Sequence, residues 1–175
     1  MFFVVSTGRC GSMTIANTLN RLPGIVCVHE PEPVLVEEAR AYMRSLLSRD
    51  ALVEVLRKTR RSSKHSLRYG ESNQKLSYMV DALMHAFPDA CFIWLVRNGI
   101  DVVASMLRQQ LYRDDIPQSA PRRTPWGQHR LRANEVGEMS QEQWQGLSPF
   151  AAYCWYWNWT NRKIQRDLSL FNIRR

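Results

Sequence analysis

A loop near the start of the chain, TGRCGS, joins two segments of different pattern. The apolar run Phe2–Val5 before it predicts a short buried strand, and the spacing of Met13–Leu19 after it predicts a helix. The loop's two glycines allow a tight turn, and Arg9 adds a permanent positive charge. Because the first N–H groups of a helix have no intrahelical acceptor, the loop predicts an anion-binding turn.

Two common nucleotide-binding motifs do not fit this loop. A Walker A motif needs GxxxxGK[ST], whereas Gly8 and Gly11 are three residues apart and no lysine follows the second glycine. The dinucleotide-binding pattern GxGxxG is also absent from the loop. These differences argue against an enzyme that uses ATP or GTP through such a loop.

A second candidate anion site follows the most apolar run, Ala90–Val96. Arg97 ends this run and Ser105 lies eight residues later, within a helical pattern over Ile100–Leu111. Two helical turns span about 12 Å, so a helix that folds back beside its strand can bring both side chains to one phosphate-sized anion. Cys91 and Arg97 also satisfy the phosphatase spacing Cx5R, but the five residues between them read as a buried strand and not as an anion-wrapping loop.

The segment VCVHEPEP contains the candidates for a general base. His29 and Glu30 follow the strand-like run Gly24–Val28, and Pro31 disfavours a helical conformation at Glu30. Either Glu30 or His29 could act as a general base, and a structural role for both is the remaining option. Three residues after a weaker strand could also line the cleft: Glu71, Ser72 and Asn73.

Strand-like and helix-like segments alternate along the chain, which predicts a doubly wound α/β fold. The strand-like segments are Phe2–Val5, Gly24–Val28, Ser66–Ser72 and Ala90–Val96. The helical patterns are Met13–Leu19, two segments within 31–61, Gln74–Phe87, Ile100–Leu111 and Ser148–Leu168. Because Ala90–Val96 is apolar throughout, we expect it to be central in a parallel sheet. A further strand is expected to begin at Phe171–Ile173.

At 175 residues, the chain predicts one domain, 1–175. Residues 112–147 lack a sustained period and are expected to form an irregular insertion, either a lid over the acceptor or a disordered segment. The aromatic segment AAYCWYWNWTN (151–161) is expected to lie on a helix, mostly as packing, with one or two rings available to stack on adenine or a sugar.

The formal net charge is +8, and nine Lys or Arg residues lie within Arg40–Arg68. This run suits either a phosphorylated or polyanionic partner or a solvated helix face. Four scattered cysteines predict neither a metal site nor a disulfide framework. The strand at Phe2 leaves no room for a signal peptide, and no apolar run is long enough to span a membrane, so we expect a soluble cytoplasmic protein.

The two anion elements in this order resemble the sulfotransferases that use 3′-phosphoadenosine 5′-phosphosulfate (PAPS). The resemblance rests on a strand, a loop with a basic residue followed by x-G-[ST], a helix, and a later strand ending in RNxxDVxxS. It implies a P-loop-like, three-layer α/β fold with a central parallel sheet flanked by helices. Family chains run well beyond 175 residues, so the C-terminal part of the family fold is expected to be absent.

The resemblance also implies roles for individual residues. The first loop would bind the 5′-phosphosulfate, and the later strand-helix element would bind the 3′-phosphate through Arg97 and Ser105. Arg9 would stabilise charge on the leaving phosphate, and no metal is required. Carbohydrate-type and bacterial members often have a Glu before a proline at such a position, so the resemblance favours Glu30 as the base, with His29 as the alternative. The implied residues of the 5′ loop are Arg9, Cys10, Gly11, Ser12, Met13 and Thr14.

The sequence thus predicts an enzyme that transfers a sulfuryl group from PAPS to a hydroxyl of a carbohydrate or small metabolite, leaving 3′,5′-adenosine bisphosphate (3′,5′-ADP). One alternative is a nucleotide or nucleoside kinase. Another is a catalytically inactive, basic nucleotide- or nucleic-acid-binding module, although nucleic acid is the less favoured partner. The sequence specifies neither the acceptor nor the oligomeric state.

Overall fold

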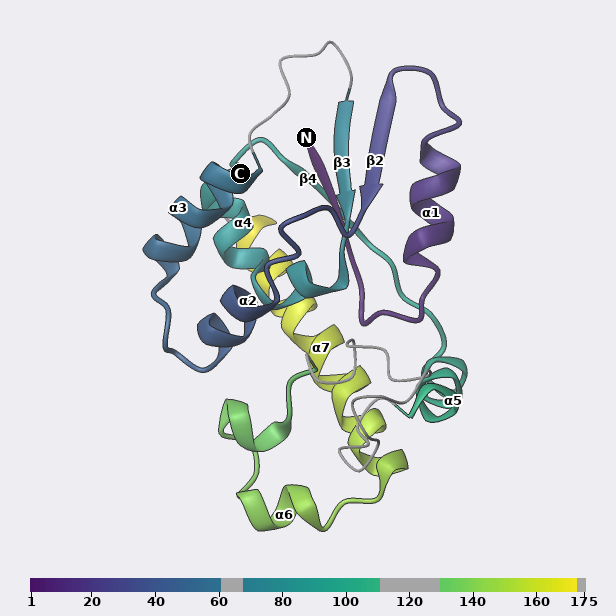
Figure 1. The fold of residues 1–175 in the computed structure, drawn as a ribbon, viewed down its shortest axis with the longest axis vertical. Helices are drawn as coiled ribbons and strands as arrows, with labels where there is room; N and C mark the ends of the chain where they lie inside the picture. Colours follow the sequence, from purple (N-terminus) through teal and green to yellow (C-terminus); the bar gives the residue numbers. More distant parts are fainter. Residues whose placement is uncertain (61–67, 111–129, 173–175) are drawn as a thin grey trace. The chain divides into compact units, whose positions relative to one another are not determined.

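The computed structural model describes residues 1–60, 68–110 and 130–172 (Figure 1). The chain divides into two compact units, which are described separately below. The first unit contains residues 1–96 and 160–175, and the second contains residues 97–159. The long helix α7 (Pro149–Asn172) contributes its first half to the second unit and its second half to the first.

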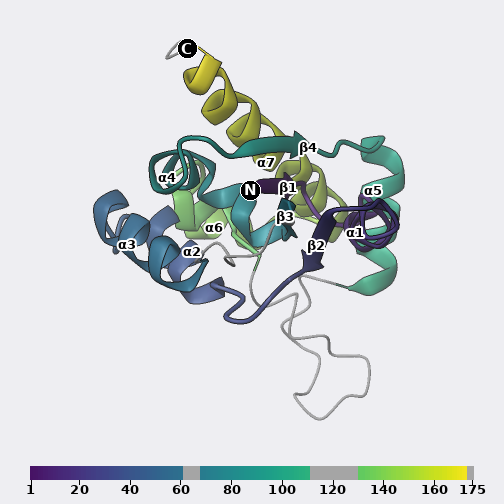
Figure 2. The same ribbon diagram turned by 90° about the horizontal axis from the view of Figure 1, so that it is seen from above.

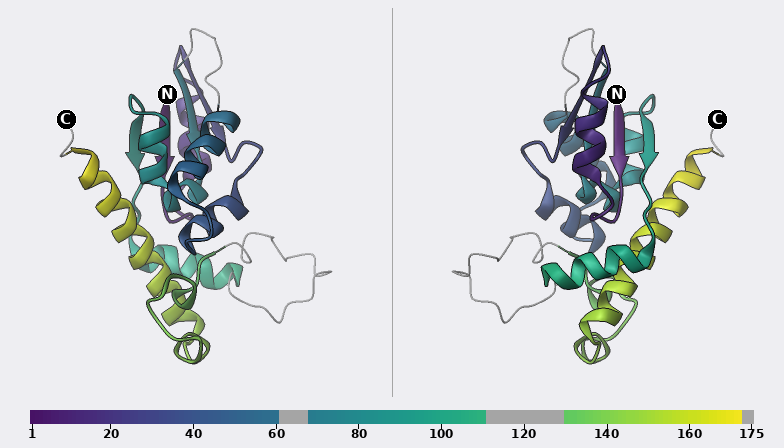
Figure 3. Two further views of the ribbon diagram at one scale, coloured as in Figure 1. Left: turned by 90° about the vertical axis from the view of Figure 1, so that its left-hand side faces the viewer. Right: turned by 90° about the vertical axis from the view of Figure 1, so that its right-hand side faces the viewer.

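A four-stranded parallel sheet forms the centre of the first unit. The strand order is β2-β3-β1-β4, and every neighbouring pair is parallel. Figure 3 shows the strands with their arrowheads at one end. The predicted parallel α/β fold is therefore confirmed. The strands are β1 (Phe2–Val5), β2 (Ile25–His29), β3 (Arg68–Ser72) and β4 (Cys91–Trp94).

Helices cover both faces of this sheet, as Figure 2 shows. The connection from β1 to β2 crosses β3 in one direction, and the connection from β3 to β4 crosses β1 in the other. Because parallel crossovers are right-handed, α1 lies on one face and α4 lies on the opposite face, beside α2 and α3. The helices are α1 (Ser12–Leu19), α2 (Val36–Met43), α3 (Arg49–Thr59), the 3-10 helix η1 (Gln74–Tyr78) and α4 (Val80–Ala86).

Aromatic packing explains two features of the sheet. Phe3 of β1 is fully buried, and its ring lies 5.6 Å from that of Phe87 and 5.7 Å from that of Phe92. The ring of Phe2 lies across Gly70, where a Cβ would come within 2.0 Å of it. The glycine of the YGES segment therefore makes room for an aromatic ring of the neighbouring strand.

The prediction that Ala90–Val96 is the central strand is wrong for the described sheet. β4 pairs with β1 and lies at one edge of the four strands. Its side chains are only partly buried: Cys91 is exposed, Phe92 packs on Phe3, and the Trp94 indole donates to Asn161 of α7 at 3.2 Å. Apolar residue types favour cover of a strand's faces, but they do not determine its position in the strand order.

The predicted helix over Gln74–Phe87 is divided in the structure. The 3-10 helix η1 ends at Tyr78, Met79 has a non-helical backbone with φ −131° and ψ 30°, and α4 begins at Val80. The Ser77 hydroxyl bonds to the backbone of Ser6 on β1's loop, which ties η1 to the sheet and interrupts the helical path. At the chain's end the strand expected from Phe171 is wrong, because α7 continues through Asn172.

The second unit is helical in its described part. The predicted helices at Ile100–Leu111 and Ser148–Leu168 correspond to α5 and α7. Within the expected insertion 112–147, residues 130–147 contain two short helices, while 112–129 lie outside the described residues. The elements are α5 (Gly99–Gln109), η3 (Ala133–Val136), α6 (Gln141–Gln145) and the first half of α7.

The aromatic residues of α7 pack within the second unit. Tyr153 and Tyr156 are buried, and the guanidinium of Arg130 lies 4.7 Å above the Tyr156 ring. Trp155 meets Trp144 edge-on at 5.4 Å and stacks on Trp159 at 5.6 Å. These contacts support the interpretation of the aromatic segment as mainly packing.

Candidate functional site

The ends of three adjacent parallel strands bring together the residues predicted around the first loop. Ser72, the last residue of β3, donates its hydroxyl to the carbonyl of Ser12 at 2.9 Å. Its own carbonyl accepts the amide of Glu30 at 3.0 Å. The start of the predicted anion loop's helix and the predicted base therefore both bond to one residue, at the carboxyl edge where open parallel sheets bind ligands.

The loop before α1 has the backbone of an anion cradle. Gly8, Arg9 and Gly11 all have positive φ, at 77°, 57° and 91°. For Arg9, a residue with a side chain, this left-handed conformation costs about 1–2 kcal/mol. α1 begins at Ser12 without a side-chain cap, and its first turn contains no acidic residue. The positive end of the helix dipole is therefore not neutralised within its own first turn.

Buried hydroxyls hold the start of this loop in place. The Ser77 hydroxyl accepts the amide of Ser6 at 2.9 Å and donates to its carbonyl at 2.8 Å. The Ser6 hydroxyl in turn accepts the amide of Gly8 at 3.2 Å. Sequence reasoning missed Ser77, for which the signal was a hydroxyl inside an otherwise apolar helical pattern.

Cys10 occupies a position inside the loop's own hydrogen bonding. Its thiol lies 3.2 Å from the Thr7 hydroxyl and donates to the carbonyl of Gly8 at 3.2 Å. Thr7 also donates to the Gly8 carbonyl at 3.0 Å. The thiol therefore braces the turn, as a hydroxyl in the same place would.

Glu30 lies at the end of β2 with an unusual backbone and a charged partner. Its φ is 46°, and its Oε1 accepts from the Lys75 Nζ at 2.6 Å. The neighbouring His29 is half-buried, and its Nδ1 has no hydrogen-bond partner among the described residues. Lys75 was not among the residues singled out from the sequence.

A second buried ion pair lies behind β3. Arg60 donates to both carboxylate oxygens of Glu71, at 2.6 and 3.1 Å, and to the carbonyl of Pro33 at 2.7 Å. Glu71 also accepts from the Asn73 amide at 3.0 Å. Arg60 belongs to the basic run at 40–68, so part of that run serves the fold and is not displayed to a polyanion.

Cys27 is a buried cysteine at the centre of β2. Burial, with a smaller contribution from the nearby Glu71 carboxylate, raises the pKa of the Cys27 thiol to about 11, so this group is a poor nucleophile. Across residues 1–60, 68–110 and 130–172, no group of three or more His, Cys, Asp or Glu could hold a metal ion.

The second predicted anion element belongs to the second unit. Arg97 precedes α5, whose N-cap Asn98 accepts the amide of Ile100 at 2.9 Å. The Arg97 guanidinium lies 3.5 Å from the carboxylate of Asp101, and both side chains are about half-exposed. Ser105, one further turn along, is buried. Since residues four apart share a helix face, Asp101 and Ser105 lie on one side of α5.

Comparison with known families gives a match over residues 36–149, well over half of the chain, to the model described as "Sulfotransferase family". This chain belongs to the sulfotransferase family. Members of the family transfer sulfuryl groups, typically from PAPS. The matched range contains Lys75, Arg97 and Ser105, and begins after Arg9 and Glu30. Searches of curated proteins and of solved structures found no match.

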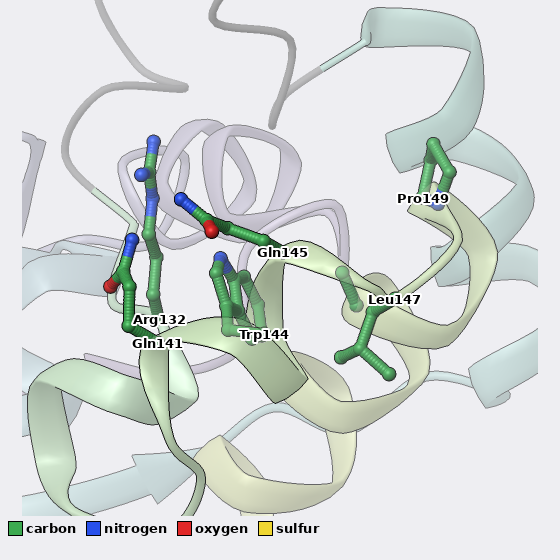
Figure 4. A pocket seen from close by; sticks show the side chains of 7 residues that line it. Arg132, Gln141, Trp144, Gln145, Leu147 and Pro149 are labelled. Atoms are coloured by element: carbon green, nitrogen blue, oxygen red, sulfur yellow. The ribbon is translucent and has the colours of Figure 1, made fainter.

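This sulfotransferase also has a cavity of about 250 Å³ in its second unit (Figure 4). Figure 4 shows the Gln141 and Gln145 amides near Arg132, with Leu147 and Pro149 farther along the wall. None of the residues predicted to bind or react lines this cavity. Its lining residues are Arg132, Gln141, Trp144, Gln145, Leu147, Pro149 and Ala152.

A helix that spans a membrane needs about 20 consecutive, predominantly apolar residues. In the ranges 1–60, 68–110 and 130–172, no helix is both long and apolar enough to cross a bilayer.

Proposed function

We propose that this chain binds PAPS and transfers its sulfuryl group to a hydroxyl of a carbohydrate or small metabolite. The observation that carries the proposal is that Ser72 forms hydrogen bonds both to Ser12, the first residue of α1, and to Glu30. An anion-binding turn and a carboxylate at one strand edge are what sulfuryl transfer to a hydroxyl requires.

The first loop fits the charged end of PAPS. Its left-handed backbone at Gly8, Arg9 and Gly11, its uncapped helix start and its lack of acidic residues all favour a doubly anionic group. Cys10, Ser12, Met13 and Thr14 would complete the binding loop, and Ser12 and Thr14 would add hydroxyl donors. Arg97 and Ser105 would hold the 3′-phosphate, as the family resemblance implies.

The chemistry of the site divides between Arg9 and Glu30. When bound, PAPS supplies a sulfuryl group attached to a good leaving group, the 5′-phosphate of 3′,5′-ADP. Arg9 stabilises the negative charge that develops on the leaving oxygen, and it acts as an electrostatic group because a guanidinium keeps its proton. The Glu30 carboxylate accepts the proton that the acceptor hydroxyl loses as its oxygen bonds to sulfur, with His29 as the alternative base.

Calorimetry with 3′,5′-ADP tests the proposal. We expect micromolar binding to the wild type and a loss of at least about tenfold in Arg97→Ala, since a charged hydrogen bond contributes about 1.5–3 kcal/mol. Arg108→Ala, an exposed arginine of α5, the helix that follows Arg97, is the control and should bind as the wild type does. ATP serves as the competing ligand. No binding of 3′,5′-ADP, or tighter binding of ATP, would contradict the proposal.

A further inference from the structure

Lys75 is a buried cation in η1. Its side chain is 4% exposed, and its Nζ lies 2.6 Å from the Oε1 of Glu30, whose side chain is 12% exposed. Removing a charge from water costs several kcal/mol unless a partner of opposite charge compensates. The two side chains therefore belong together, although they are 45 residues apart in the sequence.

Glu30 is held through both its backbone and its side chain. The backbone amide of Glu30 donates to the carbonyl of Ser72 at 3.0 Å, which fixes the backbone at the strand edge. Its φ of 46° is a left-handed conformation that costs about 1–3 kcal/mol for a residue with a side chain. Such strain persists only where surrounding contacts impose it, and the ion pair with Lys75 is one of those contacts.

Lys75 is itself fixed by a chain of buried polar contacts. Its amide donates to the Asn73 side-chain oxygen at 3.0 Å, and the Asn73 amide group donates to Glu71 at 3.0 Å. Glu71 is paired with Arg60 of the segment that follows α3. The position of Glu30 thus depends on contacts from β3, from η1 and from the end of α3.

We propose that Lys75 is the positioning residue of the general base, which deepens the proposed function and rests on it. Its ammonium holds one oxygen of Glu30, Oε1, and thereby presents Oε2 to the acceptor hydroxyl. Lys75 acts through Glu30 and does not touch the reacting atoms. The carboxylate would otherwise be free to rotate away from the strand edge.

A double-mutant cycle tests this role. The assay follows release of 3′,5′-ADP from PAPS with water, 4-nitrophenol or glucose as the acceptor. We expect Glu30→Gln and Lys75→Met each to lower kcat at least about tenfold while the Kd for 3′,5′-ADP stays within about twofold. In the Glu30→Gln background, Lys75→Met should lower kcat no further, because the base through which it acts is already absent.

Two further variants separate positioning from loss of fold. Lys75→Arg keeps the cation and should recover most of the turnover, and the thermal unfolding of each variant reports its stability. Lys58→Met, which removes an exposed lysine of α3, is the control and should match the wild type. The Glu30→Gln, Lys75→Met double variant removes both charges and so avoids a buried carboxylate without a partner.

The outcomes distinguish this proposal from the proposed function. Full kcat in Lys75→Met, or an equal loss in both backgrounds, would overturn the positioning role while binding of 3′,5′-ADP and turnover by the wild type uphold the transferase. A wild type that neither binds 3′,5′-ADP nor consumes PAPS would overturn both.

Discussion

The strand-edge site of the first unit and the Arg97–Ser105 element of the second unit are built differently. In the first, Glu30, Lys75 and Ser72 come from three separate elements and are largely buried. In the second, Arg97 and Ser105 come from one stretch of chain, and Arg97 is half-exposed beside Asp101.

This difference explains why one of the two sites could be recognised as a family motif in the sequence. A local element keeps its spacing in the chain, so RNxxDVxxS can be recognised directly, and it lies within the range matched by the family. A site assembled from several strand ends is held by tertiary contacts that have no fixed spacing. Removing one contact should therefore damage the first site through the fold and the second site only through binding.

The largest contrast is expected in stability. Arg60→Met leaves the fully buried Glu71 carboxylate without its charged partner and should lower the free energy of unfolding by about 3–5 kcal/mol. Arg97→Ala removes an exposed pair and should cost less than about 1 kcal/mol. Urea denaturation of the variants measures both values.

Arg57 supplies the control for this experiment. It pairs with Glu54 on the exposed side of α3, so Arg57→Met should cost less than about 1 kcal/mol. The double variant Arg60→Met, Glu71→Leu should be more stable than Arg60→Met alone. Equal costs at Arg60 and Arg97 would remove the proposed contrast between the two sites.

Substitutions of two serines should distinguish a residue that supports the fold, Ser77, from a residue that contacts the ligand, Ser105. Ser77→Ala leaves the buried amide and carbonyl of Ser6 without a partner and should cost about 1–3 kcal/mol of stability, with weaker 3′,5′-ADP binding as a consequence. Ser105→Ala should weaken 3′,5′-ADP binding about tenfold with a smaller loss of stability.

Calorimetry and urea denaturation of the same preparations measure both effects. Ser169→Ala, an exposed serine of α7, should change neither. The distinction between the two serines would be contradicted if Ser77→Ala loses the expected stability but binds 3′,5′-ADP normally. It would also be contradicted if Ser105→Ala binds 3′,5′-ADP as the wild type does.

A smaller effect should appear in thiol reactivity. Cys10 lies in the first loop and Cys91 is exposed on the edge strand β4. Saturating 3′,5′-ADP should slow alkylation of Cys10 by iodoacetamide several-fold and leave Cys91 unchanged, which peptide mass spectrometry can quantify. Equal rates at Cys10 with and without 3′,5′-ADP would argue against phosphate binding at this loop.

The smallest effect concerns Cys27 at alkaline pH. Burial and the nearby Glu71 carboxylate raise its pKa from 9.0 to about 11, so the unfolded chain loses this proton first. The stability that the neutral thiol contributes is complete below pH 9 and is lost as the pH rises through 11. The stability difference between the wild type and Cys27→Ala should therefore decrease from pH 8 to pH 11, and a constant difference would contradict the assignment.

Sequence reasoning predicted those parts of the protein that local patterns encode. The alternation of apolar strands and amphipathic helices predicted the parallel α/β fold. The two glycines predicted a tight turn before α1, and the structure adds that Gly8, Arg9 and Gly11 all have positive φ there. The division of Gln74–Phe87 into η1 and α4 was missed because it depends on Ser77 bonding to Ser6, 71 residues away.

Only the tertiary structure decided what surrounds Glu30. The sequence by itself determined that a carboxylate follows a short strand, because apolar β-branched residues and a proline make that pattern visible. It did not determine the cation beside it, because Lys75 has no spacing relation to Glu30. The edge position of β4 could not be predicted from the sequence either. The residue types of a strand indicate whether its faces are apolar, whereas its neighbours in the sheet depend on which strands pair in the folded chain.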